Sequence, residues 1–383
     1  MMGSSPDTDL EFATLVLGQK HFEEAENNSG ASGSNATASS LSSPRNVFFD
    51  GTKLFVADTQ NNRVLIWNTA PTVSQAAATV VIGQADMNAT SANQGGTQAD
   101  RNTLFLPRAV HVKGGKVYIA DTGNNRVLVY DSIPTANNAN ADRVIGHANF
   151  TESESNRLDN STTGVRDDTL NEPSDVYHNG DKLFVADTGN NRVLIYNSVG
   201  LTSSQASVVV GQPDTEKADI RQAAANTVKS PNGVFATSNL SIDKLLIADT
   251  GNNRILIFNS LPTSDNTSAN IVMGQASMAD AGSGTSRTTL SSPVDIFQDE
   301  GSEQFLIADS GNHRVVVFDS LPGANGASAS RVLGQKDFTS AGANRNGKID
   351  GNTLNTPRGV YTNGGLIWIA DTQNHRVLRF PAK

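Results

Sequence analysis

One phrase of eight residues occurs six times in this chain. The copies begin at Ala57, Ala120, Ala186, Ala248, Ala308 and Ala370, and each reads Ala-Asp-Thr/Ser-Gly/Gln-Asn-Asn/His-Arg-Val/Ile. Successive copies are 60 to 66 residues apart. Such a period indicates copies of one supersecondary unit, each of which buries its apolar faces only against its neighbours. Because the copies span the 383-residue chain, they predict one domain rather than the two or three that length alone allows.

Each repeat divides into four short apolar segments that are separated by turns. In the first repeat we expect strands at 44–48, 53–58, 63–67 and 79–82, with a tight turn at 59–62. The segments are rich in Val, Ile, Leu and aromatic residues, and their apolar character is nearly continuous. That pattern is typical of sheets covered on both faces, as in the blades of a β-propeller. The blades are expected near residues 44–83, 107–146, 173–211, 231–274, 293–334 and 357–383.

The fourth strands show how the ring closes. Each ends in an apolar residue followed by Gly and then Gln or His, and the glycines are Gly18, Gly83, Gly146, Gly211, Gly274 and Gly334. The first of these strands precedes the first three-strand set, whereas the last set has no fourth strand after it. The counts match only if residues 13–18 form the outer strand of the last blade, which leaves no open edge. We therefore predict an all-β fold, a six-bladed β-propeller over residues 13–383, with a flexible N-terminal segment at 1–12.

The phrase Ala-Asp-Thr-Gly-Asn-Asn-Arg-Val, placed after a strand that begins at a proline, resembles the NHL repeat. The resemblance covers residues 15–380 and implies a six-bladed propeller. The repeats here are longer than usual, mainly in the loops before each proline, which resembles bacterial NHL proteins with long loops. NHL relatives include RNA-binding proteins, protein-interaction modules, a peptide-amidating lyase and hydrolase-like enzymes, so the fold alone does not select a function.

The repeated Asp and Arg flank the turn between the second and third strands. Six identical copies do not make a differentiated site, so we interpret them as structural ion pairs. The pairs are Asp58–Arg63, Asp121–Arg126, Asp187–Arg192, Asp249–Arg254, Asp309–Arg314 and Asp371–Arg376.

Positions that differ between blades are better candidates for a binding site. Arg45, Arg108 and Arg358 directly follow the prolines of three blades that ring closure makes neighbours. Asp175 and Asp295 come from the other side of the ring. An arc of arginines opposite carboxylates predicts a site for an anionic or zwitterionic ligand at the channel mouth. The full predicted ligand-binding set is Arg45, Arg108, Arg358, Asp175, Asp295, Asn46 and Asn232.

Metal sites and catalytic residues find little support in the sequence. The resemblance to the amidating lyase would place zinc-binding histidines at the post-proline positions, but none of the six is histidine. Residues 342–350 are faintly similar to an EF-type calcium loop, although the first and last ligands are absent. We therefore predict no cofactor, no metal site and no catalytic residue, and keep a structural calcium ion in this loop as the one alternative. The chain has no cysteine, which excludes disulfides and thiolate metal ligands.

Charge and hydropathy restrict the partners. A net charge of −9 argues against nucleic acid, and no apolar run reaches the roughly 20 residues that span a bilayer. The polar start MMGSSPDTDL shows no secretory signal, and we expect an extracellular, cell-surface or periplasmic protein whose signal has been removed.

We predict a monomeric, non-catalytic scaffold that binds a protein or a small anionic or zwitterionic ligand through the long loops and the channel mouth. The alternative is a lyase-like or hydrolase-like propeller enzyme with its site at the same mouth. RNA binding is the third possibility, and the net negative charge of the chain disfavours it.

Overall fold

The structure, a computed structural model, describes residues 11–30, 36–156, 164–200, 202, 204–237, 243–298, 303–363 and 365–382. Most of the segment predicted to be flexible, residues 1–12, lies outside the described residues. Of its last two residues, Glu11 makes an ion pair of 2.8 Å between its Oε1 and Nη1 of Arg331.

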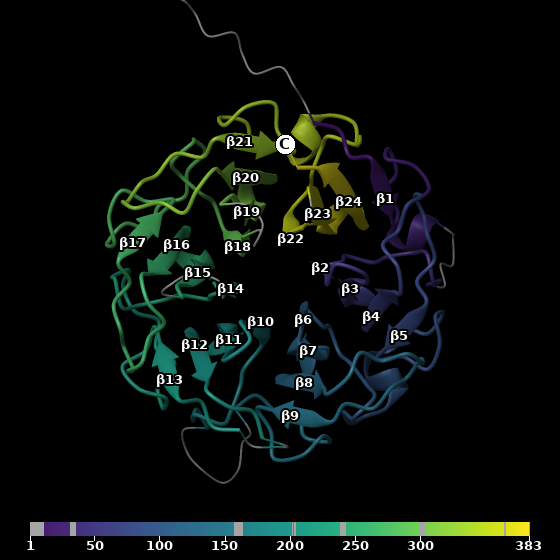
Figure 1. Ribbon diagram of the computed structural model, residues 1–383, viewed down its shortest axis with the longest axis horizontal. Coiled ribbons are helices and arrows are strands. Elements are labelled where there is room, and N and C mark those ends of the chain that lie inside the picture. The colour runs from purple at the N-terminus through teal and green to yellow at the C-terminus, as the bar shows by residue number, and fades with distance from the viewer. Residues whose placement is uncertain are drawn as a thin grey trace, which may run out of the picture.

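The described residues form six antiparallel four-stranded sheets arranged around a central axis (Figure 1). Within each sheet the strands run outward from the axis in chain order, with the exception of the last sheet. This arrangement confirms the predicted all-β, six-bladed propeller.

The first three blades, in chain order, contain β2 (Asn46–Phe49), β3 (Leu54–Asp58), β4 (Arg63–Trp67) and β5 (Val80–Ile82); β6 (Ala109–Lys113), β7 (Lys116–Asp121), β8 (Arg126–Tyr130) and β9 (Arg143–Ile145); and β10 (Pro173–His178), β11 (Leu183–Asp187), β12 (Arg192–Tyr196) and β13 (Val208–Val210). The last three contain β14 (Gly233–Ala236), β15 (Leu245–Asp249), β16 (Arg254–Phe258) and β17 (Ile271–Met273); β18 (Pro293–Gln298), β19 (Phe305–Asp309), β20 (Arg314–Phe318) and β21 (Arg331–Leu333); and β22 (Pro357–Asn363), β23 (Leu366–Asp371) and β24 (Arg376–Pro381) with β1 (Leu15–Leu17).

The chain's first strand closes the ring. β1 pairs antiparallel with β24, with Val16 opposite Leu378, so the N-terminal strand completes the sixth blade as predicted. A second link joins the sixth and first blades, because Thr372 Oγ1 donates a hydrogen bond of 2.7 Å to the carbonyl oxygen of Pro44. Equivalent hydroxyl-to-carbonyl bonds join the other neighbouring blades, as from Thr59 to Pro107 at 2.7 Å.

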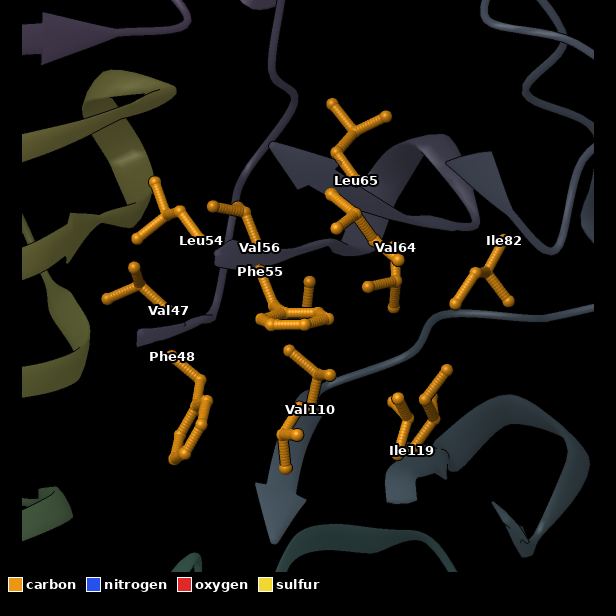
Figure 2. Packing of buried hydrophobic residues seen from close by; sticks show 14 of the residues in the cluster. Val47, Phe48, Leu54, Phe55, Val56, Val64, Leu65, Ile82, Val110 and Ile119 are labelled. Carbon is orange, nitrogen blue, oxygen red and sulfur yellow. The ribbon is translucent and has the colours of Figure 1, made fainter. Parts of the chain in front are cut away.

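The core lies between the blades. Figure 2 shows the space between the first two blades, where Phe55 of β3 lies over Val110 of β6 and near Ile119 of β7. All three side chains are at most 2% exposed. Burying one such side chain contributes about 1.5–3 kcal/mol, and it is buried only when the next blade is in place. Both faces of each sheet are covered in this way, which explains the nearly continuous apolar runs in the sequence.

Each hairpin between the second and third strands is a turn of 3₁₀ helix that ends in a left-handed residue. These turns are η2 (Thr59–Asn61), η4 (Thr122–Asn124), η5 (Thr188–Asn190), η6 (Thr250–Asn252), η7 (Ser310–Asn312) and η9 (Thr372–Asn374). In the first, Asn62 has φ 52°, a conformation that Asn tolerates better than most residues. Its Oδ1 accepts a hydrogen bond of 2.8 Å from Leu106 N of the next blade. His313 and His375 stand at this position in the last two blades and accept the same bond through Nδ1, each at 3.0 Å.

The long loops carry three further turns, η1 (Asn27–Gly30), η3 (Ala92–Gly95) and η8 (Ala343–Asn346). Each loop ends in an apolar residue that packs on the fourth-strand glycine. Gly83, for example, has φ +90°, and a Cβ there would lie 2.5 Å from Leu104 Cδ1. The repeated glycine is therefore required both by its backbone conformation and by the side chain packed upon it. The short helical turns in the described part of the chain include none with the length and apolar character needed to cross a membrane.

Candidate functional site

The repeated Asp and Arg form one buried ion pair in each blade. The distance from Arg Nε to Asp Oδ2 is 2.6–2.7 Å in all six, and every one of these side chains is 0% exposed. Each Asp Oδ2 also accepts a bond from an Asn of the same turn, at 2.7–2.9 Å.

Each of these arginines also joins two of the long loops. Arg192 Nη2 donates to the carbonyl oxygens of Arg166 and Thr169 in the preceding loop, both at 2.9 Å. Its Nη1 donates to the carbonyl oxygen of Thr215 in the following loop, at 2.5 Å. Burial raises the pKa of Asp187, while Arg192 beside it acts in the opposite direction. The same geometry recurs around the ring, so these residues hold the loops rather than distinguish one part of the ring from another.

The channel mouth is a small cup where the innermost strands begin. Its space is about 300 Å³, including the part that is open to solvent. The structure brings all seven predicted ligand-binding residues together around it. The lining consists of Arg45, Asn46, Arg108, Ala109, Ser174, Asp175, Asn232, Val294, Asp295 and Arg358.

The three arginines form an electropositive arc on one side of this cup. Burial, together with the neighbouring charges of Arg358 and Arg108, lowers the pKa of Arg45 to about 9, so its guanidinium stays charged at neutral pH. Burial and the charge of Arg108 lower the pKa of Arg358 as well. The Nε atoms of Arg45 and Arg358 are buried and have no hydrogen-bond partner among the described residues. Arg108 has a distant partner, with 3.8 Å between its Nη2 and Oε2 of Glu172.

The two carboxylates on the other side are held by backbone amides of the next blade. Asp175 Oδ2 accepts from Val234 N, and Asp295 Oδ2 accepts from Val360 N, both at 2.8 Å. The second oxygen of each accepts from the N–H of the following residue, also at 2.8 Å. Burial raises the pKa of Asp175 to about 7. Burial and the charge of Asp175 raise the pKa of Asp295 well above its usual value.

This bridging role is one that sequence reasoning missed. Asn46 makes the same link, since its Oδ1 accepts from Val110 N at 3.2 Å. The three bridging residues belong to the first, third and fifth blades, and the intervening blades have Ala or Gly at the equivalent position. At Gly359 a Cβ would lie 2.7 Å from Asn46 Cα, so the small residue permits close approach of the two blades. The alternation of Asn or Asp with Ala or Gly was the signal available in the sequence.

A closed ring of six aromatic side chains forms the floor beneath the cup. One comes from each innermost strand: Phe48, His111, Tyr177, Phe235, Phe297 and Tyr361. Neighbouring ring centroids are 4.2–5.4 Å apart all the way around. Burial lowers the pKa of His111 to about 3, so it is a neutral member of this ring. A further cavity, with about 300 Å³ of space including any part open to solvent, lies between Asn46, Asp175 and Asp295 of the cup and these aromatic side chains.

The loop considered for calcium begins at η8. There Arg345 Nη2 donates to the carbonyl oxygen of Asn352 at 2.6 Å, and Asp350 Oδ1 accepts from Gly351 N at 2.6 Å. Within the described residues, no three His, Cys, Asp or Glu side chains are grouped to hold a metal ion. The calcium hypothesis stays a prediction.

Comparison with known protein families gives a match to one of the six repeats. The family model described as the NHL repeat matches residues 354–380, which span β22, β23 and most of β24. This segment is similar to an NHL repeat. It contains the Asp371–Arg376 pair, and the other five blades have the same pair at the same turn. The predicted NHL resemblance is confirmed, whereas the bacterial origin stays a prediction.

Several solved structures are similar to this chain at low identity. A virginiamycin B lyase from Staphylococcus aureus is 10% identical with a TM-score of 0.44, over 89% of this chain and 95% of that one. The computationally designed protein Ika8 is 9% identical with a TM-score of 0.45, over 97% and 99% of the two chains. No curated protein matches the chain.

Proposed function

We propose that the chain is a non-catalytic binding protein whose channel-mouth cup receives an anionic group of a small ligand or of a protein segment. The observation that carries the proposal is the pair of buried, unpartnered Nε atoms of Arg45 and Arg358. The two side chains repel each other, and the described residues provide neither of them with an ion pair. A bound carboxylate or phosphate would pair with the two guanidinium groups and relieve the repulsion.

The chemistry of the cup favours an anionic group over a zwitterionic one. Guanidinium groups bind carboxylates and phosphates through two parallel hydrogen bonds, which are stronger than neutral hydrogen bonds. Asp175 and Asp295, the residues available for a ligand cation, already accept backbone N–H bonds through both oxygens. Protonation of these carboxyls, which their raised pKa values favour, would further weaken their attraction for a cation.

The long loops would extend recognition beyond the charged group. The cup is small, so the anionic end of a ligand would enter while the rest of the ligand stays above it. The loops before each innermost strand lie on this same face, because the turn arginines bind their carbonyl oxygens. Loops fixed on a rigid scaffold are common binding surfaces.

The test is a calorimetric titration of the protein with inorganic phosphate and with citrate. We expect the variant Arg45→Ala/Arg358→Ala to lose at least ~10-fold in affinity, corresponding to about 1.4 kcal/mol. Its melting temperature should not fall, because the substitution removes two mutually repelling charges that lack partners.

The matched control is Lys217→Ala/Arg221→Ala, which removes the same charge from a long loop and leaves the cup intact. Equal affinity of the mouth variant and the wild type would refute the proposal, as would an equal loss in the control. Turnover of a bound ligand would instead support the lyase-like or hydrolase-like alternative.

A further inference from the structure

The outermost strand of each blade has an edge that faces away from its own sheet, and in four blades a segment of the next blade covers this edge. In the first blade, Val81 N of β5 donates a hydrogen bond of 3.0 Å to Asn137 Oδ1, and the carbonyl oxygen of Val81 accepts one of 3.1 Å from Asn138 N. The same two bonds cover Val16 of β1, Val209 of β13 and Val272 of β17. Covering an edge in this way prevents it from pairing with another chain.

The covering segments connect the third and fourth strands of a blade, and they share one sequence pattern. Counted back from the first residue of the fourth strand, a proline stands nine positions earlier, Ser, Asn or Asp six positions earlier, and Ala two positions earlier. The Ser, Asn or Asp is the residue whose side chain accepts the bond from the covered strand. The four sets are Pro71, Ser74 and Ala78; Pro134, Asn137 and Ala141; Pro262, Asp265 and Ala269; and Pro322, Asn325 and Ala329.

The edge of β21, the outermost strand of the fifth blade, has no such cover within the described part of the chain. Val332 is its middle residue and pairs with Val316 of β20, as Val81 pairs with Leu65 in the first blade. Neither the N–H nor the C=O of Val332 has the covering bond among the described residues. Two of the three residues of β21 are only half-buried, whereas β1, β5, β13 and β17 are buried throughout. This edge is therefore available to a further segment.

Ring closure indicates where the segment for this edge stands in the sequence. The sixth blade follows the fifth around the ring, as Figure 1 shows, and its fourth strand is β1. The segment that covers β21 in the same way must therefore precede Leu15, the first residue of β1. The sequence there repeats the pattern, with Pro6, Asp9 and Ala13 at the three positions. Pro6 and Asp9 lie outside the described residues, and Ala13 lies within them.

The described end of this segment already has the geometry of the other four. Ala13 N donates a hydrogen bond of 2.8 Å to the carbonyl oxygen of Gly351, in the loop before β22. The alanines of the four covering segments make the equivalent bond to the loop before their own blade, at 2.7–2.9 Å. Glu11 lies beside β21 itself, because its Oε1 is 2.8 Å from Nη1 of Arg331 and its side chain is only 4% exposed. The chain thus reaches the uncovered strand at Glu11.

We propose that residues 6–10 cover the edge of β21, with the Asp9 carboxylate accepting a hydrogen bond from Val332 N and Leu10 N donating one to the carbonyl oxygen of Val332. An aspartate has this role elsewhere in the chain, since Asp265 Oδ1 accepts from Val209 N at 2.8 Å. Composition alone led us to expect a flexible segment at 1–12, whereas the shared pattern assigns its second half to the sixth blade. This inference is independent of the anion site at the channel mouth.

One position fits the pattern less well and provides a second way to test it. The residue after the side-chain acceptor is left-handed in all four covering segments, with φ between 56° and 66° at Gln75, Asn138, Asn266 and Gly326. Leu10 stands at this position before β1. A left-handed backbone is unfavourable for leucine and unrestricted for glycine. Leu10→Gly should therefore strengthen the cover.

The test is hydrogen–deuterium exchange of the Val332 amide, measured by NMR on the full chain. We expect Asp9→Ala to speed this exchange at least ~10-fold, because the amide loses a hydrogen bond to a charged group. Leu10→Gly should slow it relative to the wild type. Asp7→Ala removes a carboxylate two positions away and is the matched control, which should leave the exchange rate unchanged. Asn325→Ala should speed exchange of the Val272 amide, whose bond to Asn325 Oδ1 is 2.9 Å, and so calibrates the effect.

Three outcomes would overturn the proposal. The first is an equal rate of exchange at Val332 in the wild type and in Asp9→Ala. The second is an equal acceleration by Asp7→Ala, which would mean that the charge of the segment matters and its register does not. The third is protection of Val332 that increases with protein concentration, because a second copy of the chain would then cover the edge of β21.

Discussion

The buried Asp187–Arg192 pair gives the sharpest prediction about stability. In the variant Arg192→Met, Asp187 would keep two donors, Asn190 Nδ2 at 2.8 Å and Asn171 N at 2.7 Å. It would lose its bonded cation, while three loop carbonyl oxygens would lose their donor. Removing one partner of a buried ion pair costs about 3–5 kcal/mol. With unfolding entropy near 2.1 cal/mol/K per residue, this loss lowers the melting temperature by about 4–6 °C.

The assay is urea and thermal unfolding, followed by circular dichroism and by the fluorescence of the buried Trp67 and Trp368. A double-mutant cycle separates the charge from the packing. We expect Asp187→Asn/Arg192→Met to be destabilised by clearly less than the sum of its single variants, because it leaves no unpaired buried charge. Additive losses would refute the explanation by ion pairing. Arg221→Met is the control and should change stability little, because among the described residues this loop guanidinium bonds Asn226 and Asn266 and no carboxylate.

Three further predictions concern the turns and the bridging residues. Gly83→Ala should destabilise the protein by about 1–3 kcal/mol, measured by urea unfolding, because its Cβ would collide with Leu104. Burial lowers the pKa of His313 and of His375, so their contribution to stability is complete above about pH 6.5 and declines as the pH falls below it. The double variant with Asn at both positions should show a smaller decline in melting temperature between pH 7 and pH 5. Burial raises the pKa of Asp175 to about 7, so the stability that its protonation supplies is lost as the pH rises from about 4 to 7. Asp175→Asn should remove that part of the pH dependence of stability. An unchanged dependence of stability on pH would contradict the burial assigned to Asp175.

The fold could be predicted from the sequence because the sequence features that determine it are each repeated six times. The strand pattern, the turn and the fourth-strand glycine recur in register, and the surplus first strand could pair only with the last blade. The convergence of Arg45, Arg108 and Arg358 followed from ring closure alone.

The finer structure of the site depends on contacts between blades, which have no local signature. Nothing within the segment around Asp175 indicates that its Oδ2 accepts a hydrogen bond from Val234 N, 59 residues further along the chain. The ring of six aromatic side chains likewise takes one residue from each blade. Such contacts between blades can be recognised only when the positions of the neighbouring sheets are known.

The pairing of β1 with β24 also sets an order of events for a chain emerging from the ribosome. Thr14 and Arg379, hydrogen-bonded to each other, are 365 positions apart, so at about 5–20 residues per second the leading strand waits roughly 20–70 s for its partner. Throughout that interval the apolar triplet Leu15–Leu17 is an unsatisfied edge that is free to join another nascent chain. The segment Leu15–Leu17 therefore needs protection until β24, its partner strand, has been synthesised.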